Sequence, residues 1–276
     1  MAKSKGFTGK PLVPSAAIAD DFERGTLILI RKMCAETKRE LKALFHDPAY
    51  ALDKADDDGN PASGARIVIN RLVRKYEPLF KRWAKKSSRR MVDRSLKHAS
   101  VQLKGSLKDV GEAMTIQPYF MNDRLREITT ASAQEAADLI KLIPQKYLSE
   151  VAGQTMRSIT SGKGMADLIP YLNDKYGQNI RHARLVAHDQ TRKTFTNISR
   201  ERAKAAGIEE FEWRHSSGGR HPRKLHQELN GQVFRLDDPP YIGDMYGKKV
   251  YGLPSELPNC RCFMRLKVNF GDKSDD

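Results

Sequence analysis

The stretch that decides the fold runs from residue 181 to residue 215, where a helical pattern gives way to a strand pattern. It comprises Arg181–Ala206 (RHARLVAHDQTRKTFTNISRERAKAA), Gly207 and Ile208–His215 (IEEFEWRH). The first part carries apolar side chains at helical spacing, and Gly207 is a typical left-handed helix stop. Beyond it, Phe211 and Trp213 alternate with charged residues, as in a half-buried strand. The chain is therefore expected to be α+β.

Two further strands are expected downstream of this switch. Their sequences are Gln232–Leu236 (QVFRL) and Arg261–Val268 (RCFMRLKV), separated by a Pro-, Gly- and Tyr-rich loop over residues 237–258. Short runs of alternating pattern bounded by turn residues are typical of antiparallel strands. The C-terminal part is thus predicted to be a small α+β module with a short antiparallel sheet.

The N-terminal two-thirds are expected to be mostly helical. Apolar stripes predict helices over residues 22–45, over 66–104 and over 122–143. Pro78 is expected to kink the second of these or to begin a new helix, and Pro144 to begin another that runs to about residue 160. A short helix should then end at Gly177. The expected organisation is a mobile arm (1–15), a helical region (16–164) that includes the long basic helix (66–104), the α+β module (165–268) and an acidic mobile tail (269–276).

Composition restricts the class of protein. The chain has 276 residues and a formal net charge of +15, with a pI of about 9.7 and a mean hydropathy of −0.62. No run approaches the roughly 18 apolar residues of a spanning helix, and no apolar signal core follows the basic start. Three cysteines are too few for a disulfide scaffold, which favours a reducing compartment. We therefore expect a protein without a membrane partner that faces a polyanion or an acidic surface.

Most of the excess charge lies in one segment. Residues 66–108 contain 14 basic and 2 acidic side chains, more imbalance than a solvated helix face requires, because unpaired like charges repel. The interpretation is contact with a phosphate backbone or with an acidic protein surface; the alternative is an ordinary solvated face. The expected contacts with nucleic acid or with an acidic partner are Arg71, Arg74, Lys75, Lys81, Arg82, Lys85, Lys86, Arg89, Arg90 and Arg94.

A second candidate site joins His226 to Cys260 and Cys262. Thiolate and imidazole ligands can form a tetrahedral zinc site, although a Cys-x-Cys pair with a single His lacks the usual two Cys-x-x-Cys pairs. The alternative is that the cysteines pack as small apolar residues. No other motif indicates a cofactor or catalytic residues: Ser161–Gly164 lacks the flanking residues of a phosphate-binding loop, and His221 with Asn230 lacks a third ligand for a metal-dependent nuclease.

Several separated motifs resemble the phage Mu F-like minor head proteins, also called phage head morphogenesis proteins. They are the helix Arg181–Thr191, the segments Pro222–His226 and Asn230–Phe234, and the closing Asn259–Cys262 with its Cys-Arg-Cys sequence. The motifs follow the family's order across about residues 165–268. One departure is Gly218-Gly219, where many members carry an Asp before the shared His.

The resemblance implies a non-enzymatic minor capsid protein of a tailed bacteriophage. Such a protein lies inside the head near the portal, in the host cytoplasm during assembly and in the virion afterwards, and acts in procapsid assembly and in DNA packaging or ejection. Its implied partners are the portal and other head proteins, with packaged double-stranded DNA as a further partner. A sequence-independent DNA-binding protein remains an alternative, and a metal-dependent nuclease or toxin-like enzyme is another.

Overall fold

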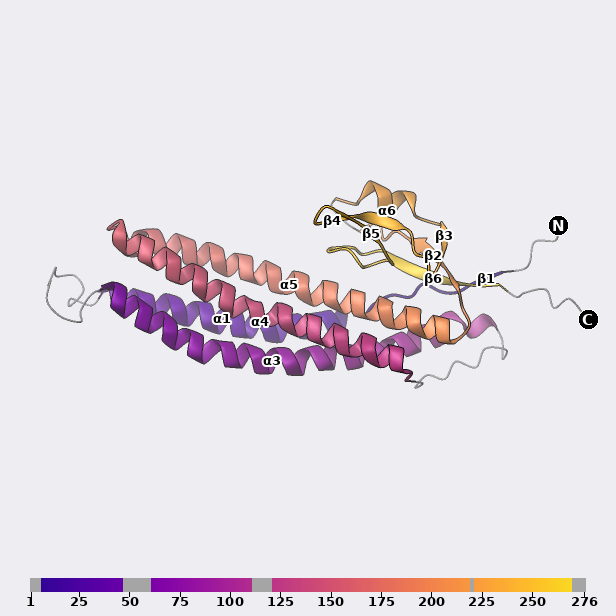
Figure 1. Cartoon of the computed structure of the whole chain (residues 1–276), viewed down its shortest axis with the longest axis horizontal. Coiled ribbons are helices and arrows are strands. Elements are labelled where there is room, and N and C mark those ends of the chain that lie inside the picture. The colour runs from indigo at the N-terminus through magenta and orange to yellow at the C-terminus, as the bar shows by residue number, and fades with distance from the viewer. Residues whose placement is uncertain (1–5, 47–60, 111–120, 219–220, 270–276) are drawn as a thin grey trace, which may run out of the picture. The chain divides into compact units, whose positions relative to one another are not determined.

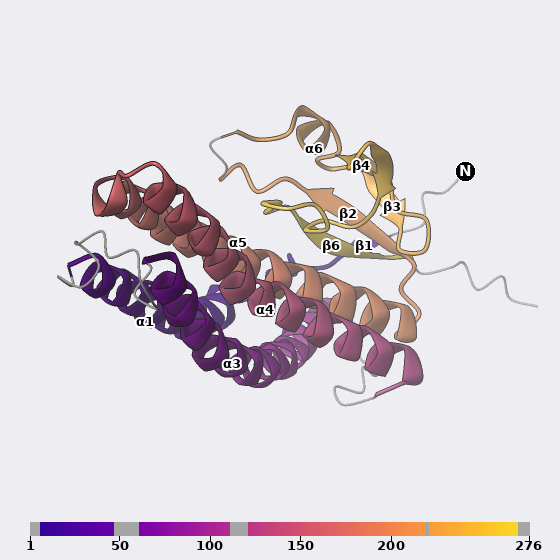
Figure 2. The same cartoon turned by 60° about the vertical axis from the view of Figure 1, so that its left-hand side comes forward.

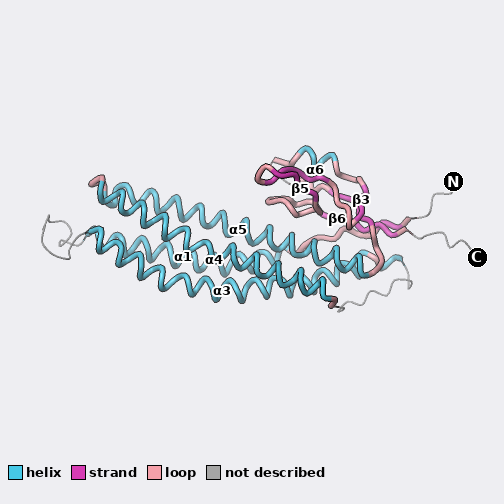
Figure 3. The backbone as a smooth tube through the Cα atoms, in the orientation of Figure 1, coloured by secondary structure: helices cyan, strands magenta, loops and turns pink. Residues whose placement is uncertain are grey.

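A computed structural model describes residues 6–46, 61–110, 121–218 and 221–269, and Figures 1 and 3 show their helices and strands. The helices are α1 (Ala16–His46), α3 (Pro61–Ser106), the 3-10 helix η1 (Lys108–Val110), α4 (Asp123–Thr160), α5 (Gly164–Ala205) and α6 (Lys224–Glu228). The strands are β1 (Phe7–Thr8), β2 (Glu210–Arg214), β3 (Val233–Arg235), β4 (Tyr241–Met245), β5 (Lys248–Tyr251) and β6 (Phe263–Val268). The α+β class expected from the sequence is confirmed.

The chain divides into two compact units, and the four long helices α1, α3, α4 and α5 each contribute residues to both. The helical unit consists of Asp20–Arg89 and Gln134–Ala187. The sheet unit consists of Met1–Ala19, Arg90–Ala133 and His188–Asp276. Each unit therefore combines segments that are far apart in the sequence.

The helical unit is a bundle in which segments of α1, α3, α4 and α5 lie side by side (Figure 2). Each helix buries one apolar stripe, as expected for amphipathic helices that share a core. The largest side chains that are almost fully buried here are Ile30, Met33, Leu41, Leu72, Phe80 and Tyr147. No helix in the described ranges is long and apolar enough to cross a membrane.

The close approach of α1 to α3 depends on a glycine. A Cβ added to Gly25 would fall inside the van der Waals radius of the Trp83 ring. The Trp83 indole N–H donates a hydrogen bond of 3.0 Å to the Thr26 hydroxyl on α1. Glycine at position 25 thus lets the indole approach α1 closely and reach its partner.

The sheet unit is built on an antiparallel sheet with the strand order β1-β6-β2-β3. The central pair β2 and β6 aligns Phe211 with Leu266 and Trp213 with Met264. These four side chains are at most 2% exposed and face one core. The three strands predicted from the sequence are all present, with bounds shifted by one or two residues.

Residues 7–12 are not a mobile arm, contrary to expectation. Phe7 and Thr8 form β1, which pairs with β6. Leu12 bridges Met264 and is 1% exposed, so it contributes to the sheet unit's core. A strand of two residues carries no alternating pattern, and its partner lies some 260 residues away along the chain. Residues 1–5 of the expected arm and 270–276 of the expected tail lie outside the described residues.

The segment 237–258 is not simply a loop, because it contains the hairpin of β4 and β5. Tyr246 and Gly247 at its tip both have positive φ, 52° and 74°, as in the type I′ turn that favours tight hairpins. The usual sequence signal for that turn is Asn-Gly or Asp-Gly. Because the chain has Tyr-Gly at this turn, sequence patterns did not predict the hairpin.

Two expected helix boundaries are wrong, because α4 continues through Pro144 and α5 continues past Gly177. α3 also continues through Pro78, so no new helix begins there. A proline inside a helix loses one backbone hydrogen bond and costs roughly 3 kcal/mol. The long apolar stripes on both sides of each proline are buried in the bundle, and their packing offsets this local cost. The expected helix stop at Asp47-Pro48 lies outside the described residues.

Candidate functional site

The predicted metal ligands His226, Cys260 and Cys262 converge in the sheet unit. His226 lies on α6 and is 2% exposed, and both cysteines lie just before β6 and are 4% exposed. The His226 Nδ1 atom is 3.5 Å from the Cys260 Sγ atom and 3.6 Å from the Cys262 Sγ atom. All three potential ligand atoms lie within 4.8 Å of one another. The fold therefore brings together two segments that are 34 residues apart.

A hydrogen bond at the Nε2 atom sets the orientation of the His226 imidazole. The His226 Nε2 atom lies 3.0 Å from the carbonyl oxygen of Ile242 in β4. A carbonyl oxygen can only accept, so Nε2 carries the proton. Nδ1 then presents its lone pair to the two sulfurs. The edge of the Trp213 ring packs against the imidazole with ring centroids 5.2 Å apart, which further limits its rotation.

Backbone and indole N–H groups surround the sulfurs. The Ser255 N–H donates to the Cys260 sulfur over 3.4 Å. The Trp213 indole N–H is buried and has no conventional hydrogen-bond partner among the described residues, but it lies beside the Cys262 sulfur, where it acts to lower the pKa of that thiol. Donors of this kind favour a thiolate over a thiol.

The two cysteines differ in acidity. The hydrogen bond from the Cys262 thiol, together with the one from the Ser255 N–H, lowers the pKa of Cys260 to about 4, although burial raises it. The same hydrogen bond to Cys260, together with burial, raises the pKa of Cys262 well above its ordinary value. A nearby cation would favour ionisation of the second thiol.

Two residues from other elements hold the Cys-x-Cys segment in place. The Asn259 N–H donates to both carboxylate oxygens of Asp189 on α5, at 3.1 and 3.0 Å. Asn259 has a φ of 60°, so this contact stabilises a left-handed turn directly before Cys260. The Arg223 guanidinium donates to the Pro258 carbonyl oxygen over 2.9 Å. Sequence reasoning missed Asp189, because its partner lies 70 residues away.

The second predicted site is the basic helix, which is α3. Nine of the ten predicted contact residues are exposed, and Arg94 is half-buried. Arg71 forms an ion pair with Glu40, and Lys75 pairs with Glu36 over 2.6 Å, so both are neutralised within the bundle. Arg90 and Arg94 lie in the part of α3 that belongs to the sheet unit.

The remaining six basic residues form what we call the basic face of the helical unit. No ion pair within the described part of the chain involves them. At 100° per residue they occupy an arc of about 140°, and at 1.5 Å per residue they extend over about 22 Å of helix. The basic face consists of Arg74, Lys81, Arg82, Lys85, Lys86 and Arg89.

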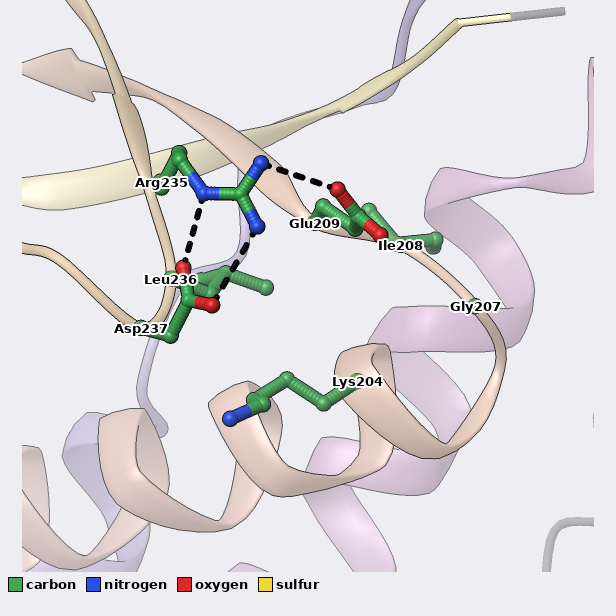
Figure 4. Close-up of a pocket in the computed structure, with 7 residues that line it drawn as sticks. All are labelled: Lys204, Gly207, Ile208, Glu209, Arg235, Leu236 and Asp237. Atoms are coloured by element: carbon green, nitrogen blue, oxygen red, sulfur yellow. Dashed lines mark hydrogen bonds and ion pairs between the residues drawn. The ribbon is translucent and has the colours of Figure 1, made fainter. Parts of the chain in front are cut away.

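A small pocket in the sheet unit is a further possible site (Figure 4). Its volume is about 160 Å³, below the roughly 300 Å³ at which organic ligand sites begin. Arg235, its most polar lining group, is bound by Glu209 at 3.0 Å and by Asp237 at 3.0 Å. Lys204 and Leu236 complete the lining together with Gly207 and Ile208. Because Arg235, Glu209 and Asp237 pair with one another, these three charges are not available to a ligand.

Comparison with known proteins finds a family that matches part of the chain. Residues 149–265 match the model of the family described as "Phage Mu protein F like protein". This range contains the convergent His and Cys residues as well as Asp189 and all of α6. No solved structure matches the chain.

Two curated proteins are similar over part of their length. An uncharacterized protein of Haemophilus influenzae is 28% identical over 142 residues, which are 51% of this chain and 29% of that protein. An NAD(+)--arginine ADP-ribosyltransferase of Enterococcus faecalis, EFV, is 31% identical over 127 residues, which are 42% of this chain and 26% of that enzyme. The chain thus spans less than a third of the curated relatives it matches. Residues 149–265 of the chain thus resemble the Phage Mu protein F like family, which is the family that the motifs in the sequence indicated.

Proposed function

We propose that the protein is a minor head protein of a tailed bacteriophage, located inside the capsid near the portal, and that it acts in procapsid assembly and in DNA packaging or ejection. The observation that carries the proposal is the family match over residues 149–265. In this proposal the sheet unit, which contains most of the matched residues, is the folded anchor within the head. The helical unit presents the basic face to an acidic partner.

The basic face fits a polyanion better than a specific ligand. Its six cationic side chains are long, exposed and spread along about 22 Å of one helix. Such an array can follow phosphates at successive positions without reading base edges. Packaged double-stranded DNA is the partner that we favour for this face, and an acidic surface of the portal is the alternative.

We further propose that the role is not enzymatic. The Phage Mu protein F like family is not an enzyme family, and the similarity to EFV covers about a quarter of that enzyme. His226, the side chain best suited to acid–base chemistry in this region, is 2% exposed and has both ring nitrogens engaged. A substrate could reach it only if β4 or the Cys-x-Cys segment opened.

The proposal is tested by co-expression of the full chain with the portal protein of the same phage, followed by affinity capture of the portal and gradient sedimentation. We expect the chain to sediment with the portal at a fixed ratio in low and moderate salt. Sedimentation of the chain alone under all conditions would contradict a portal-proximal role.

The enzymatic alternative is tested separately. The purified chain is incubated with plasmid DNA and divalent metal, and with NAD⁺ and an arginine acceptor. We expect no turnover in either assay. Turnover that disappears in a His226→Ala variant would overturn the non-enzymatic assignment.

A further inference from the structure

The buried cluster of His226, Cys260 and Cys262 has the dimensions of a metal site. Zinc–sulfur bonds of about 2.3 Å and zinc–nitrogen bonds of about 2.05 Å at a tetrahedral angle place nitrogen and sulfur about 3.6 Å apart. The two distances from the Nδ1 atom to the sulfurs are 3.5 and 3.6 Å. Both therefore agree with two edges of one coordination tetrahedron.

Hydrogen bonding alone explains only one of the two contacts. With Nε2 protonated and bound to the Ile242 carbonyl, Nδ1 has a single lone pair. It can accept at most one S–H proton, yet the two sulfurs lie at nearly equal distances from it, 3.5 and 3.6 Å. A cation located between the three atoms would use the lone pair and both sulfurs at once.

The surroundings have the features of a second shell around a metal. Metal-bound histidines usually donate their other N–H to a carbonyl or carboxylate, as His226 does to Ile242. The Trp213 indole N–H is buried without a conventional partner among the described residues, and a metal-bound thiolate beside it would give it a charged acceptor. Asp189 holds the turn before Cys260 through the Asn259 N–H, so the sulfurs are positioned before any metal arrives.

We infer that His226 Nδ1, Cys260 Sγ and Cys262 Sγ bind one zinc ion that links α6 to the segment before β6. Two thiolates and one imidazole select zinc over the hard cations magnesium and calcium, which require oxygen ligands. Binding releases the thiol protons and leaves the oxidation states unchanged. No fourth His, Cys, Asp or Glu joins the cluster within the described residues, so the fourth position would be open to a ligand such as water. The inference does not depend on the proposed function, because it concerns only the sheet unit.

The test uses the full chain, purified from zinc-supplemented cells, with metal measured by plasma mass spectrometry. We expect about one zinc per chain in the wild type and in Cys34→Ser, the matched control, because Cys34 is buried in the helical unit. The Cys260→Ser, Cys262→Ser double variant should retain less than a tenth of that zinc. Equal zinc in the wild type and the double variant, or zinc-free wild type, would overturn the inference.

Two further measurements do not require the variants to fold. A mercurial reagent that titrates thiols in the wild type should release the zinc to a chromogenic chelator as the second thiol reacts. Cobalt substituted for zinc should show thiolate-to-cobalt charge-transfer absorption. Zinc release before any thiol reacts would contradict the site, and so would the absence of that absorption in cobalt-loaded protein. An intact-mass loss of about 2 Da, which indicates a Cys260–Cys262 disulfide, would contradict it as well.

Discussion

If the basic face binds DNA, neutralising four of its six charges should change the salt dependence of binding by a calculable amount. The proposed variant carries Lys81→Gln, Lys85→Gln, Lys86→Gln and Arg89→Gln. These side chains are exposed and make no ion pair within the described residues, so their loss should not disturb the bundle. Glutamine preserves length and helix propensity while it removes the charge.

The magnitude follows from counterion release. Each phosphate contact contributes about −0.9 to the slope of log K against log salt concentration. Six contacts give a slope of about −5.4 and two give about −1.8. Between 50 and 200 mM salt, the wild type should lose roughly three orders of magnitude in affinity and the variant roughly one.

The assay is fluorescence anisotropy with a duplex of arbitrary sequence at four salt concentrations. A control variant removes the same charge from exposed positions on other helices: Arg31→Gln, Lys32→Gln, Lys42→Gln and Lys146→Gln. The control should keep most of the wild-type slope, because its positions lie outside the basic face. Equal slopes for the two variants would show that net charge alone drives binding. A flat response of the wild type would remove DNA as the partner of the basic face.

Two further predictions concern stability, measured by urea unfolding followed by circular dichroism. Gly25→Ala should lower the free energy of unfolding by about 1–2 kcal/mol, because the cost of displacing the Trp83 ring exceeds the gain in helix propensity. The control is Gly153→Ala in α4, where the added Cβ meets only the flexible end of a neighbouring arginine. This substitution should raise the free energy of unfolding by up to about 1 kcal/mol. A change of the same sign in both variants would refute the packing argument. Asp189→Ala should cost about 1–3 kcal/mol by leaving the Asn259 N–H without its acceptor, and should weaken zinc binding about 10- to 100-fold. Wild-type stability and zinc affinity in Asp189→Ala would show that the turn is held by other contacts.

The α+β class and the three strands could be predicted because their signals are local. Phe211 and Trp213 alternate with charged residues, and this pattern persists in the folded strand β2. The continuous helices could not be predicted at their prolines. Local rules place a break at Pro144, and only the packing of the stripes on both sides outweighs it.

The residue types of the candidate metal site were visible in the sequence, but its geometry was not. The position of His226 relative to Cys260 depends on the pairing of β2 with β6 and on the place of α6, both of which are long-range. Asp189 illustrates the same limit, since nothing in its own helix indicates that its carboxylate binds a turn 70 residues later. Its occurrence within the helix that resembles the head morphogenesis family was the available signal.

The proposed place of the protein in the phage head can be tested by quantitative peptide mass spectrometry of purified heads from the phage that encodes the chain. Heads and tails are separated, and peptides of the chain are counted against those of the portal protein. We predict that the chain is present in the head fraction at a fixed ratio to the portal and is depleted from tails. Its absence from heads that contain portal would contradict the account.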